Sequence, residues 1–246
     1  MKILLLDIET APNLVHVWGL WQQNVGIPQI ITSGYILCWA AKWYGEDKVM
    51  FDSIHKSGKK TMLRRIHRLL EQADVVVHYN GKKFDIPTLN KEFILSDLTP
   101  PSPYRQVDLL STCRTQFKFP SNKLQYVAKA LGLPGKAKTV GHDLWIQCMA
   151  NNPDAWKDME NYNTQDVNVL ERVYIKLRPW IKNHPNYGLH KEDGLVCTNC
   201  GSTHYQRRGT TQTKNQVYAR YQCTDCGTWF RGAKTEKQKH ESFRAI

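Results

Sequence analysis

The sequence predicts an α/β fold, a mixed five-stranded sheet flanked by helices, followed by a small metal-binding module. Three strand-like segments come in succession before residue 55, and strand-like and helix-like segments then alternate to about residue 180. Two Cys-x-x-Cys pairs lie near the C-terminus. A chain of 246 residues is long enough for one medium domain and one small module.

The first three expected strands differ in their apolar patterns. Residues 2–8 form a nearly unbroken aliphatic run, which is typical of a central strand covered on both faces. Residues 33–44 and 48–54 are strand-like and are separated by Gly-Glu-Asp at 45–47, a turn signal that favours antiparallel neighbours.

The next segments alternate between helix and strand. Residues 61–73 place Leu63, Ile66 and Leu70 on one face, which indicates a helix. The following patterns predict a strand over 74–79, a helix over 86–95, a strand near Val107 and a helix over 123–131.

A last long helix has clear signals at both ends. Asn152 is an expected N-cap and Pro153 fits the first helical turn. The helix is expected to run to about Arg178, where Pro179 follows. The polar segment 184–194 is the expected linker, so we expect one domain over residues 1–185 and a second over 190–246, ending in a basic tail.

Charge and hydropathy narrow the classes of function. The net charge of +12 and the pI of 9.4 favour polyanionic partners. No apolar run approaches the roughly 18 residues that a membrane span needs. The apolar run 3–6 is followed at once by Asp7 and Glu9, which excludes a secretory signal peptide, so a cytoplasmic protein is expected.

Acidic residues recur where elements begin or end. Asp7 and Glu9 lie two residues apart at the end of a strand, so their side chains share one face, and a divalent cation would relieve their repulsion. Asp85 follows a glycine loop and could equally be a helix N-cap. Tyr162 and Asp166 are four residues apart and share a helix face, as they also would in any amphipathic helix.

Together these segments resemble a known family. The tetrapeptide Asp-Ile-Glu-Thr at 7–10, the segment 80–85 that ends in Phe84-Asp85, and the segment 162–167 match, in order, the three exonuclease motifs of the DnaQ-like DEDD 3′-to-5′ exonucleases. Asn161 stands where the histidine subclass has its histidine, so the chain is most similar to the tyrosine subclass.

The resemblance implies an RNase H-like domain over about residues 1–180 and a set of roles. Asp7, Glu9, Asp85 and Asp166 would bind two Mg²⁺ or Mn²⁺ ions, and Tyr162 would orient the attacking water. The expected reaction releases nucleoside monophosphates from a nucleic acid 3′ end, with DNA favoured as substrate. A structure-specific endonuclease and a non-catalytic adaptor that binds nucleic acid remain alternatives.

Other residues are candidate contacts with nucleic acid. Asn80 and Lys82 lie in the second motif, and Trp18 lies in an aromatic segment, 13–32, that could stack on bases or pack in the core. Asp108 could be a helix cap or support the site. The segment Gly-His-Asp-Leu-Trp at 141–145 could line the cleft, with His142 as an ordinary loop histidine.

The C-terminal cysteines fit a Cys₄ zinc site. Cys197 and Cys200 precede Cys223 and Cys226 by 22 intervening residues, and a glycine follows each pair, as in the zinc ribbons that the segment resembles. A redox dithiol and disulfides are the competing interpretations. This segment also contains basic and aromatic residues that could bind nucleic acid, namely Arg207, Arg208, Arg220 and Trp229. A zinc ribbon can instead bind another protein. Expected partners are single-stranded DNA or a 3′ end, and a replication or repair protein.

Overall fold

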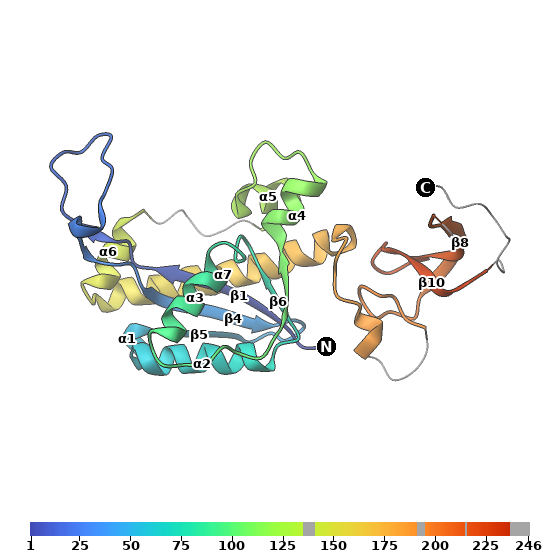
Figure 1. The fold of residues 1–246 in the computed structure, drawn as a ribbon, viewed down its shortest axis with the longest axis horizontal. Helices are drawn as coiled ribbons and strands as arrows, with labels where there is room; N and C mark the ends of the chain where they lie inside the picture. Colours follow the sequence, from blue (N-terminus) through green and yellow to red (C-terminus); the bar gives the residue numbers. More distant parts are fainter. Residues whose placement is uncertain (135–140, 191–194, 215, 237–246) are drawn as a thin grey trace. The chain divides into compact units, whose positions relative to one another are not determined.

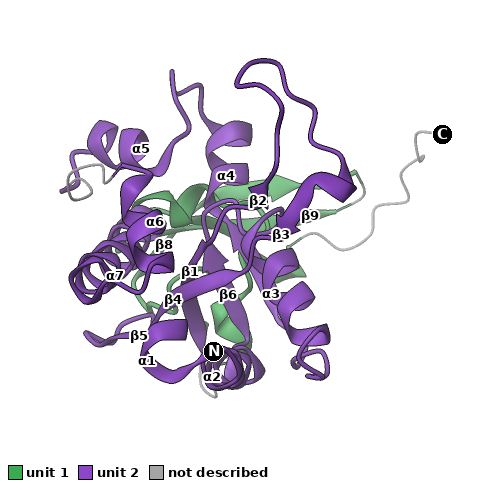
Figure 2. Cartoon of the chain, turned by 90° about the vertical axis from the view of Figure 1, so that its left-hand side faces the viewer, with its two compact units in different colours: residues 1, 176–246 green, residues 2–175 purple. Residues whose placement is uncertain are grey.

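The computed structural model describes residues 1–134, 141–190, 195–214 and 216–236 (Figure 1). The chain divides into two compact units: the first in sequence, Lys2–Ile175, is purple in Figure 2 (unit 2 of its key), and the second, Lys176–Ile246 together with Met1, is green (unit 1 of its key). Part of the expected linker, 191–194, and the expected basic tail from residue 237 onward lie outside the described residues.

The first unit contains five strands of one sheet, a small two-stranded arm, seven α-helices and a short 3-10 helix (Ile27–Gln29) within its described residues. In chain order the strands and α-helices are β1 (Ile3–Thr10), β2 (Leu14–Val15), β3 (Ile30–Thr32), β4 (Ile36–Trp43), β5 (Val49–Ser53), α1 (Ile54–Ser57), α2 (Lys59–Gln72), β6 (Val75–His78), α3 (Asp85–Ile94), β7 (Arg105–Asp108), α4 (Leu109–Gln116), α5 (Leu124–Ala130), α6 (Asp143–Met149) and α7 (Pro153–Leu177).

The sheet is mixed, with strand order β5-β4-β1-β6-β7. β1 pairs antiparallel with β4, and β4 with β5, while β6 and β7 add in parallel on the other side of β1. Helical crossovers lead into both parallel strands, as parallel connections require. The predicted fold class is confirmed, and β1 is its central strand.

Helices cover both faces of this sheet. On one face Leu4 and Leu6 of β1 pack in a cluster with Met62 of α2 and Leu89 of α3. On the other face Leu37 of β4 joins a second cluster with five residues from α6 and α7. They are Leu144, Cys148, Ala155, Trp156 and Met159. Burial on both faces explains why the sequence of β1 is an unbroken aliphatic run.

Three short α-helices were not predicted from the sequence. α1 has four residues, α4 has eight and α6 has seven, so none repeats an apolar face often enough to give a periodic signal. The longer predicted elements agree with the structure to within about three residues at each end. The N-cap of α7 is as predicted, since the Asn152 side chain accepts a hydrogen bond from the Asp154 amide at 3.0 Å.

The second unit is built around a three-stranded sheet of order β10-β9-β8, all antiparallel. Its strands are β8 (Tyr205–Gln212), β9 (Val217–Cys223) and β10 (Trp229–Thr235). Only a few of its described side chains are buried, among them Cys197 and Cys223. A core this small contributes little stability, so the cysteine cluster described below matters for this unit.

Candidate active site and cysteine cluster

Three carboxylates meet between β1 and α7. Asp7 and Glu9 leave β1 on the face that α7 covers, and Asp166 projects from the middle of α7. One oxygen from each carboxylate lies within 4.8 Å of the other two. Asp166 is buried, and the other two are partly buried. Carboxylates held this close repel one another, and a divalent cation with oxygen ligands would relieve that repulsion.

Asn163, which the sequence did not single out, contacts this cluster directly. Its side chain is fully buried, and its Nδ2 donates a hydrogen bond to Asp7 Oδ2 at 2.6 Å. Its Oδ1 lies 3.8 Å from the Sγ of Cys38 on β4. The amide therefore ties α7 to the sheet and fixes one Asp7 oxygen. An asparagine within an amphipathic helix gives no sequence signal that could have revealed this.

Asp85 is the first residue of α3 and not its N-cap, which is Phe84, and its side chain accepts a hydrogen bond from the backbone of β1. Pairing between β1 and β6 covers only Ile3–Leu5, and beyond it the Ile8 amide donates to Asp85 Oδ1 at 3.3 Å. Asp85 is not a member of the cluster of three, but it binds the residue between Asp7 and Glu9. Burial raises the pKa of Asp85 to about 7, while the backbone N–H groups of Asp85 and Ile8 work in the opposite direction.

A tight loop between β6 and α3 sets the position of Asp85. The Gly81 amide donates to Nδ1 of buried His78 at 3.1 Å, and a Cβ on Gly81 would lie 2.3 Å from the His78 ring. Asn80 adopts a left-handed conformation with φ of 73°. Only glycine fits at 81, because any side chain there would overlap the histidine.

Asp108 holds the same loop from the end of β7. Its carboxylate accepts hydrogen bonds from the Asn80 amide at 3.0 Å and the Lys82 amide at 3.3 Å. It also caps α4, since it accepts from the amides of Leu110 and Ser111. The interpretation of Asp108 as a helix cap is therefore confirmed, and the same carboxylate also holds the loop that precedes Asp85.

Tyr162 lies one turn before Asp166 on α7, where the sequence places both on one face. Its ring meets that of Trp145 on α6 edge to face, with centroids 5.7 Å apart. Within the segment 141–145, which was expected to line the cleft, Trp145 is thus the residue that packs against a candidate site residue. The contact restricts how the Tyr162 ring can turn.

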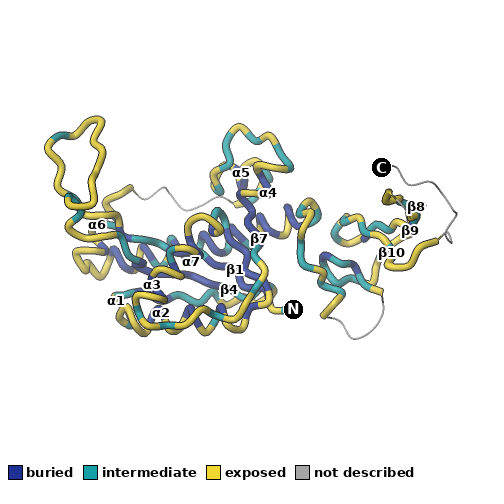
Figure 3. Tube along the Cα trace, in the orientation of Figure 1, coloured by how far each residue is buried: buried dark blue, intermediate teal, exposed yellow. Residues whose placement is uncertain are grey.

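The segment that joins β1 to β4 forms an exposed arm over residues 12–34, which includes β2 and β3. Trp18 is 100% exposed and Trp21 is 85% exposed, and Figure 3 shows nearly the whole arm as exposed. The alternative that these tryptophans pack in the core is therefore wrong. The two ends of the arm meet beside the carboxylates, because Glu9 pairs with Cys38 and Thr10 with Ile36.

In the second unit the four cysteines converge. All four Sγ atoms lie within 4.8 Å of one another, and the pairs Cys197–Cys226 and Cys200–Cys223 are each 3.6 Å apart. Zinc–sulfur bonds of about 2.3 Å in a tetrahedron imply sulfur atoms about 3.8 Å apart. The thiols thus fit a tetrahedral cation.

The predicted basic and aromatic contacts of this unit lie on its sheet. Arg207 and Arg208 are exposed on β8, and Arg207 is paired with Glu236. The Arg220 guanidinium stacks over the Trp229 ring at 5.1 Å, and its Nε donates to the Arg208 carbonyl at 3.0 Å. Three further aromatic rings, Tyr205, Tyr221 and Phe230, pack together.

Comparison with known proteins places the chain in a family. Residues 32–178, more than half of the chain, match the RNase H superfamily, so the chain belongs to that superfamily. The matched span contains Asp85, Tyr162 and Asp166 and starts after Asp7 and Glu9. No curated protein gave a match.

A solved structure with a similar fold is the family B DNA polymerase from the hyperthermophilic archaeon Pyrobaculum calidifontis. Its TM-score is 0.56 at 17% sequence identity, and the match covers 72% of this chain. The chain corresponds to only 24% of the polymerase chain, so the likeness concerns the fold.

Superfamily membership supports nuclease activity and binding of nucleic acid in general terms. None of the helices in the described part of the chain combines the length and apolarity that crossing a membrane requires.

Proposed function

We propose that the chain is a divalent-cation-dependent 3′-to-5′ exonuclease of the tyrosine DEDD subclass, which releases nucleoside monophosphates. The observation that carries this proposal is the meeting of Asp7, Glu9 and Asp166 within 4.8 Å on an RNase H-like fold. Asp85 joins them through the Ile8 amide, and Tyr162 lies one turn from Asp166.

The donor set suits Mg²⁺ or Mn²⁺, because every candidate ligand atom is a carboxylate oxygen. Asp7, Glu9 and Asp166 would hold the cations, and Asp85 would complete the set. Two bound cations would supply an activated water and stabilise negative charge on the phosphoryl group and the leaving 3′ oxygen. Asn163 keeps the Asp7 carboxylate oriented by donating to its Oδ2.

Tyr162 would orient the attacking water through its hydroxyl group. Its ring is restrained by Trp145, so the hydroxyl can remain in one position while a strand enters and leaves. Asn80 and Lys82 are candidates for contacts with the substrate, since they lie in the loop that precedes Asp85 and Asp108 holds both of their amides.

We assign cleavage to a domain over residues 1–185 and a zinc ribbon to residues 190–246, which would hold the strand. The likeness of the chain to part of a DNA polymerase favours DNA, either single-stranded or at a 3′ end. A replication or repair protein is a further candidate partner. The four converging thiols support zinc as the metal of the ribbon.

The test uses DNA and RNA oligonucleotides of the same sequence, labelled at either end, with Mg²⁺ or Mn²⁺. The exonuclease should shorten 5′-labelled strands stepwise and release labelled monophosphate from 3′-labelled ones. Asp166→Asn should abolish cleavage. Asp154→Asn is the matched control, because it removes an exposed carboxylate from the same helix and should leave activity unchanged.

Each outcome decides between functions. One internal cut would overturn the proposal in favour of a structure-specific endonuclease on the same fold. Binding of labelled strands without any cleavage, under conditions where both cations are tested, would favour an adaptor that binds nucleic acid.

A further inference from the structure

The second unit contains a cavity of about 250 Å³, and of its lining residues only Trp229 has an expected role, as a contact with nucleic acid. It lies between the segment that follows α7 and the two cysteine loops. Its lining includes Trp180, Lys182 and His184 from that segment, and Asn199, Thr228 and Trp229 from the cysteine loops and the start of β10. All of them belong to the unit that begins at Lys176, so the cavity is complete within it.

Two tryptophans supply aromatic walls. Trp180 is 57% exposed and Trp229 is 52% exposed, although both line the cavity. The Arg220 guanidinium lies over the Trp229 ring at 5.1 Å and is itself fixed by the Arg208 carbonyl. Trp229 is therefore held in place, and a prearranged ring loses little entropy when a planar ligand stacks on it.

The polar groups of the wall are cationic or neutral. Lys182 is exposed at the cavity, and none of the described lining residues is acidic. Burial lowers the pKa of His184 to about 4, so its ring is neutral near pH 7 and can take part in hydrogen bonds without charge. Asn199 donates to the Thr228 hydroxyl at 2.7 Å, which fixes that part of the wall.

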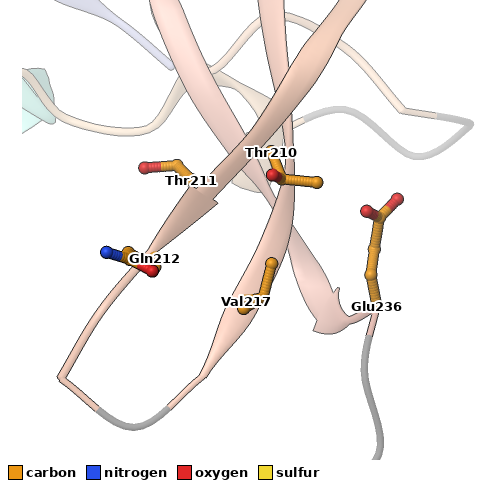
Figure 4. A pocket seen from close by; sticks show the side chains of 5 residues that line it. All are labelled: Thr210, Thr211, Gln212, Val217 and Glu236. Carbon is orange, nitrogen blue, oxygen red and sulfur yellow. The ribbon is translucent and has the colours of Figure 1, made fainter.

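A second hollow on the same unit has a different lining and serves as a comparison. It is lined by Thr210, Thr211, Gln212, Val217 and Glu236 (Figure 4). Its described lining has no aromatic ring and therefore offers no stacking surface, and its one charged side chain, Glu236, is paired with Arg207. The cavity beside Trp229 has the opposite chemistry.

We propose that the cavity beside Trp229 binds one unpaired nucleobase of a single-stranded nucleic acid, with Lys182 contacting a phosphate of the same strand. Its volume is below the roughly 300–1,000 Å³ of sites for drug-sized ligands, so it suits one base and not a base pair. Aromatic rings that stack on bases tolerate any sequence. The site extends the proposed function, but it does not depend on cleavage by the first unit.

The test measures binding of a short fluorescein-labelled thymidine oligonucleotide by anisotropy. The protein is the full chain carrying Asp7→Ala, without chelator, so that the strand stays intact and the cysteines keep their metal. Trp180→Leu and Trp229→Leu should each raise the Kd about 5- to 100-fold. Trp180→Phe should recover much of the affinity, because it keeps an aromatic ring at that position.

A matched ligand and a matched variant separate stacking from folding. An abasic strand of equal length should bind the parent and the tryptophan variants equally well. Thr211→Val, in the other hollow, should leave the Kd for the thymidine strand unchanged. Every variant should retain one metal ion per chain. Lys182→Gln should lower the slope of log Kd against log salt by about 0.7, the value for one phosphate on a single strand.

If both tryptophan variants bind the thymidine oligonucleotide with the Kd of the parent, the proposal is overturned. The cavity would then be assigned to an aromatic side chain of a protein partner. An equal loss for the abasic strand would also overturn it. Failure of the cleavage assay described above would leave this result intact, since the binding assay uses a chain that does not cut.

Discussion

The buried amide of Asn163 fixes a carboxylate that the proposed mechanism needs. Asn163→Ala removes the donor to Asp7 Oδ2, so Asp7 loses its orientation and the cation site becomes looser. We expect a 10- to 100-fold loss in the affinity for Mn²⁺ or in cleavage, roughly the range for residues that support metal ligands. Isothermal titration with Mn²⁺ and initial cleavage rates would measure the effect.

Asn168→Ala is the matched control for this substitution. Asn168 lies on the same helix and contacts Lys42 at 3.4 Å, but Lys42 retains its ion pair with Glu171. The control should keep the Mn²⁺ affinity of the parent. Equal affinities for Mn²⁺ in Asn163→Ala and the parent would contradict the assigned role of Asn163.

The backbone at Gly81 leaves no room for a side chain. In Gly81→Ala the new Cβ would lie 2.3 Å from the His78 ring, and the loop before Asp85 would have to shift. Overpacking of this kind costs about 1–3 kcal/mol of unfolding free energy. Urea denaturation should show that loss, whereas Gly141→Ala, which has open space around its Cβ, should change little.

His78 should remain neutral in the folded protein. Burial lowers its pKa, with Asp108 and the Gln106 side chain opposing the shift, and Nδ1 accepts the Gly81 amide. A lowered folded-state pKa means that the stabilisation is complete above the unfolded pKa near 6.5 and is lost as the pH falls below it. Between pH 7 and 5 the unfolding free energy of the parent should therefore fall more steeply than that of His78→Gln.

NMR of the histidine rings provides a direct measurement of the same effect. The His78 ring should show the neutral form, with its proton on Nε2 near Gln106 Oε1 at 3.2 Å, well below pH 6.5. A ring that titrates with its ordinary pKa would contradict this assignment.

The roles of some single residues could be predicted from the sequence, and those of others could not. Asp7 and Glu9 stand out because charged side chains interrupt an apolar strand, whereas Asp166 is one of many charged residues of an amphipathic helix and was singled out by the resemblance to the third exonuclease motif. Asp108 was predicted as either a cap or a support because the sequence cannot show how many amides one carboxylate binds. Asn163 gave no signal, since its importance arises from a contact with Asp7, 156 residues away.

Among the elements, length decided what could be predicted. β1 and α7 carry long, regular apolar patterns and were predicted with nearly their observed bounds. α4 begins at a cap that the sequence suggested, but eight residues with a mixed face give no clear period. The sequence showed that the arm is rich in aromatic residues. It could not show that the arm is exposed, because its composition of Trp, Leu, Val and Ile is also typical of a buried segment.

The arm between β1 and β4 contains no Asp, Glu, Lys or Arg, so it has no Lys or Arg side chain to form ion pairs with phosphates. Trp18 could stack on unpaired bases that approach the carboxylates, as base stacking contributes about 1–3 kcal/mol per base. Trp18→Ser should therefore weaken binding of single-stranded DNA about 5- to 100-fold in the Asp7→Ala chain, measured by anisotropy. Stability should not change, because the side chain is 100% exposed.

Leu20→Ser is the control for the arm, since Leu20 is 88% exposed but has no ring. It should leave the affinity for DNA unchanged. An equal effect of both substitutions would show that the arm acts through general apolar contact, as it would with a protein partner.

At the scale of the whole molecule, the two units depend on different forces. The two apolar clusters described above consist of residues of Lys2–Ile175, so hydrophobic burial on two faces of the sheet stabilises the first unit. The second unit buries few side chains within its described residues, and its thiols are placed to share one cation. Metal binding should therefore supply most of its folding free energy.

Removal of that metal should unfold one unit and spare the other. In a chain treated with a thiol-compatible zinc chelator, hydrogen exchange should become fast throughout β8, β9 and β10 while β1, β4 and α7 keep their protection. Cys223→Ser should produce the same pattern and lower the zinc content below one ion per chain, because three thiolates leave the tetrahedral site incomplete. Cys113→Ala, which removes a buried thiol outside the cluster, should keep both zinc and protection. Loss of protection in both units at once would mean that the first unit cannot fold without the second, contrary to the separate cores on which the expectation rests.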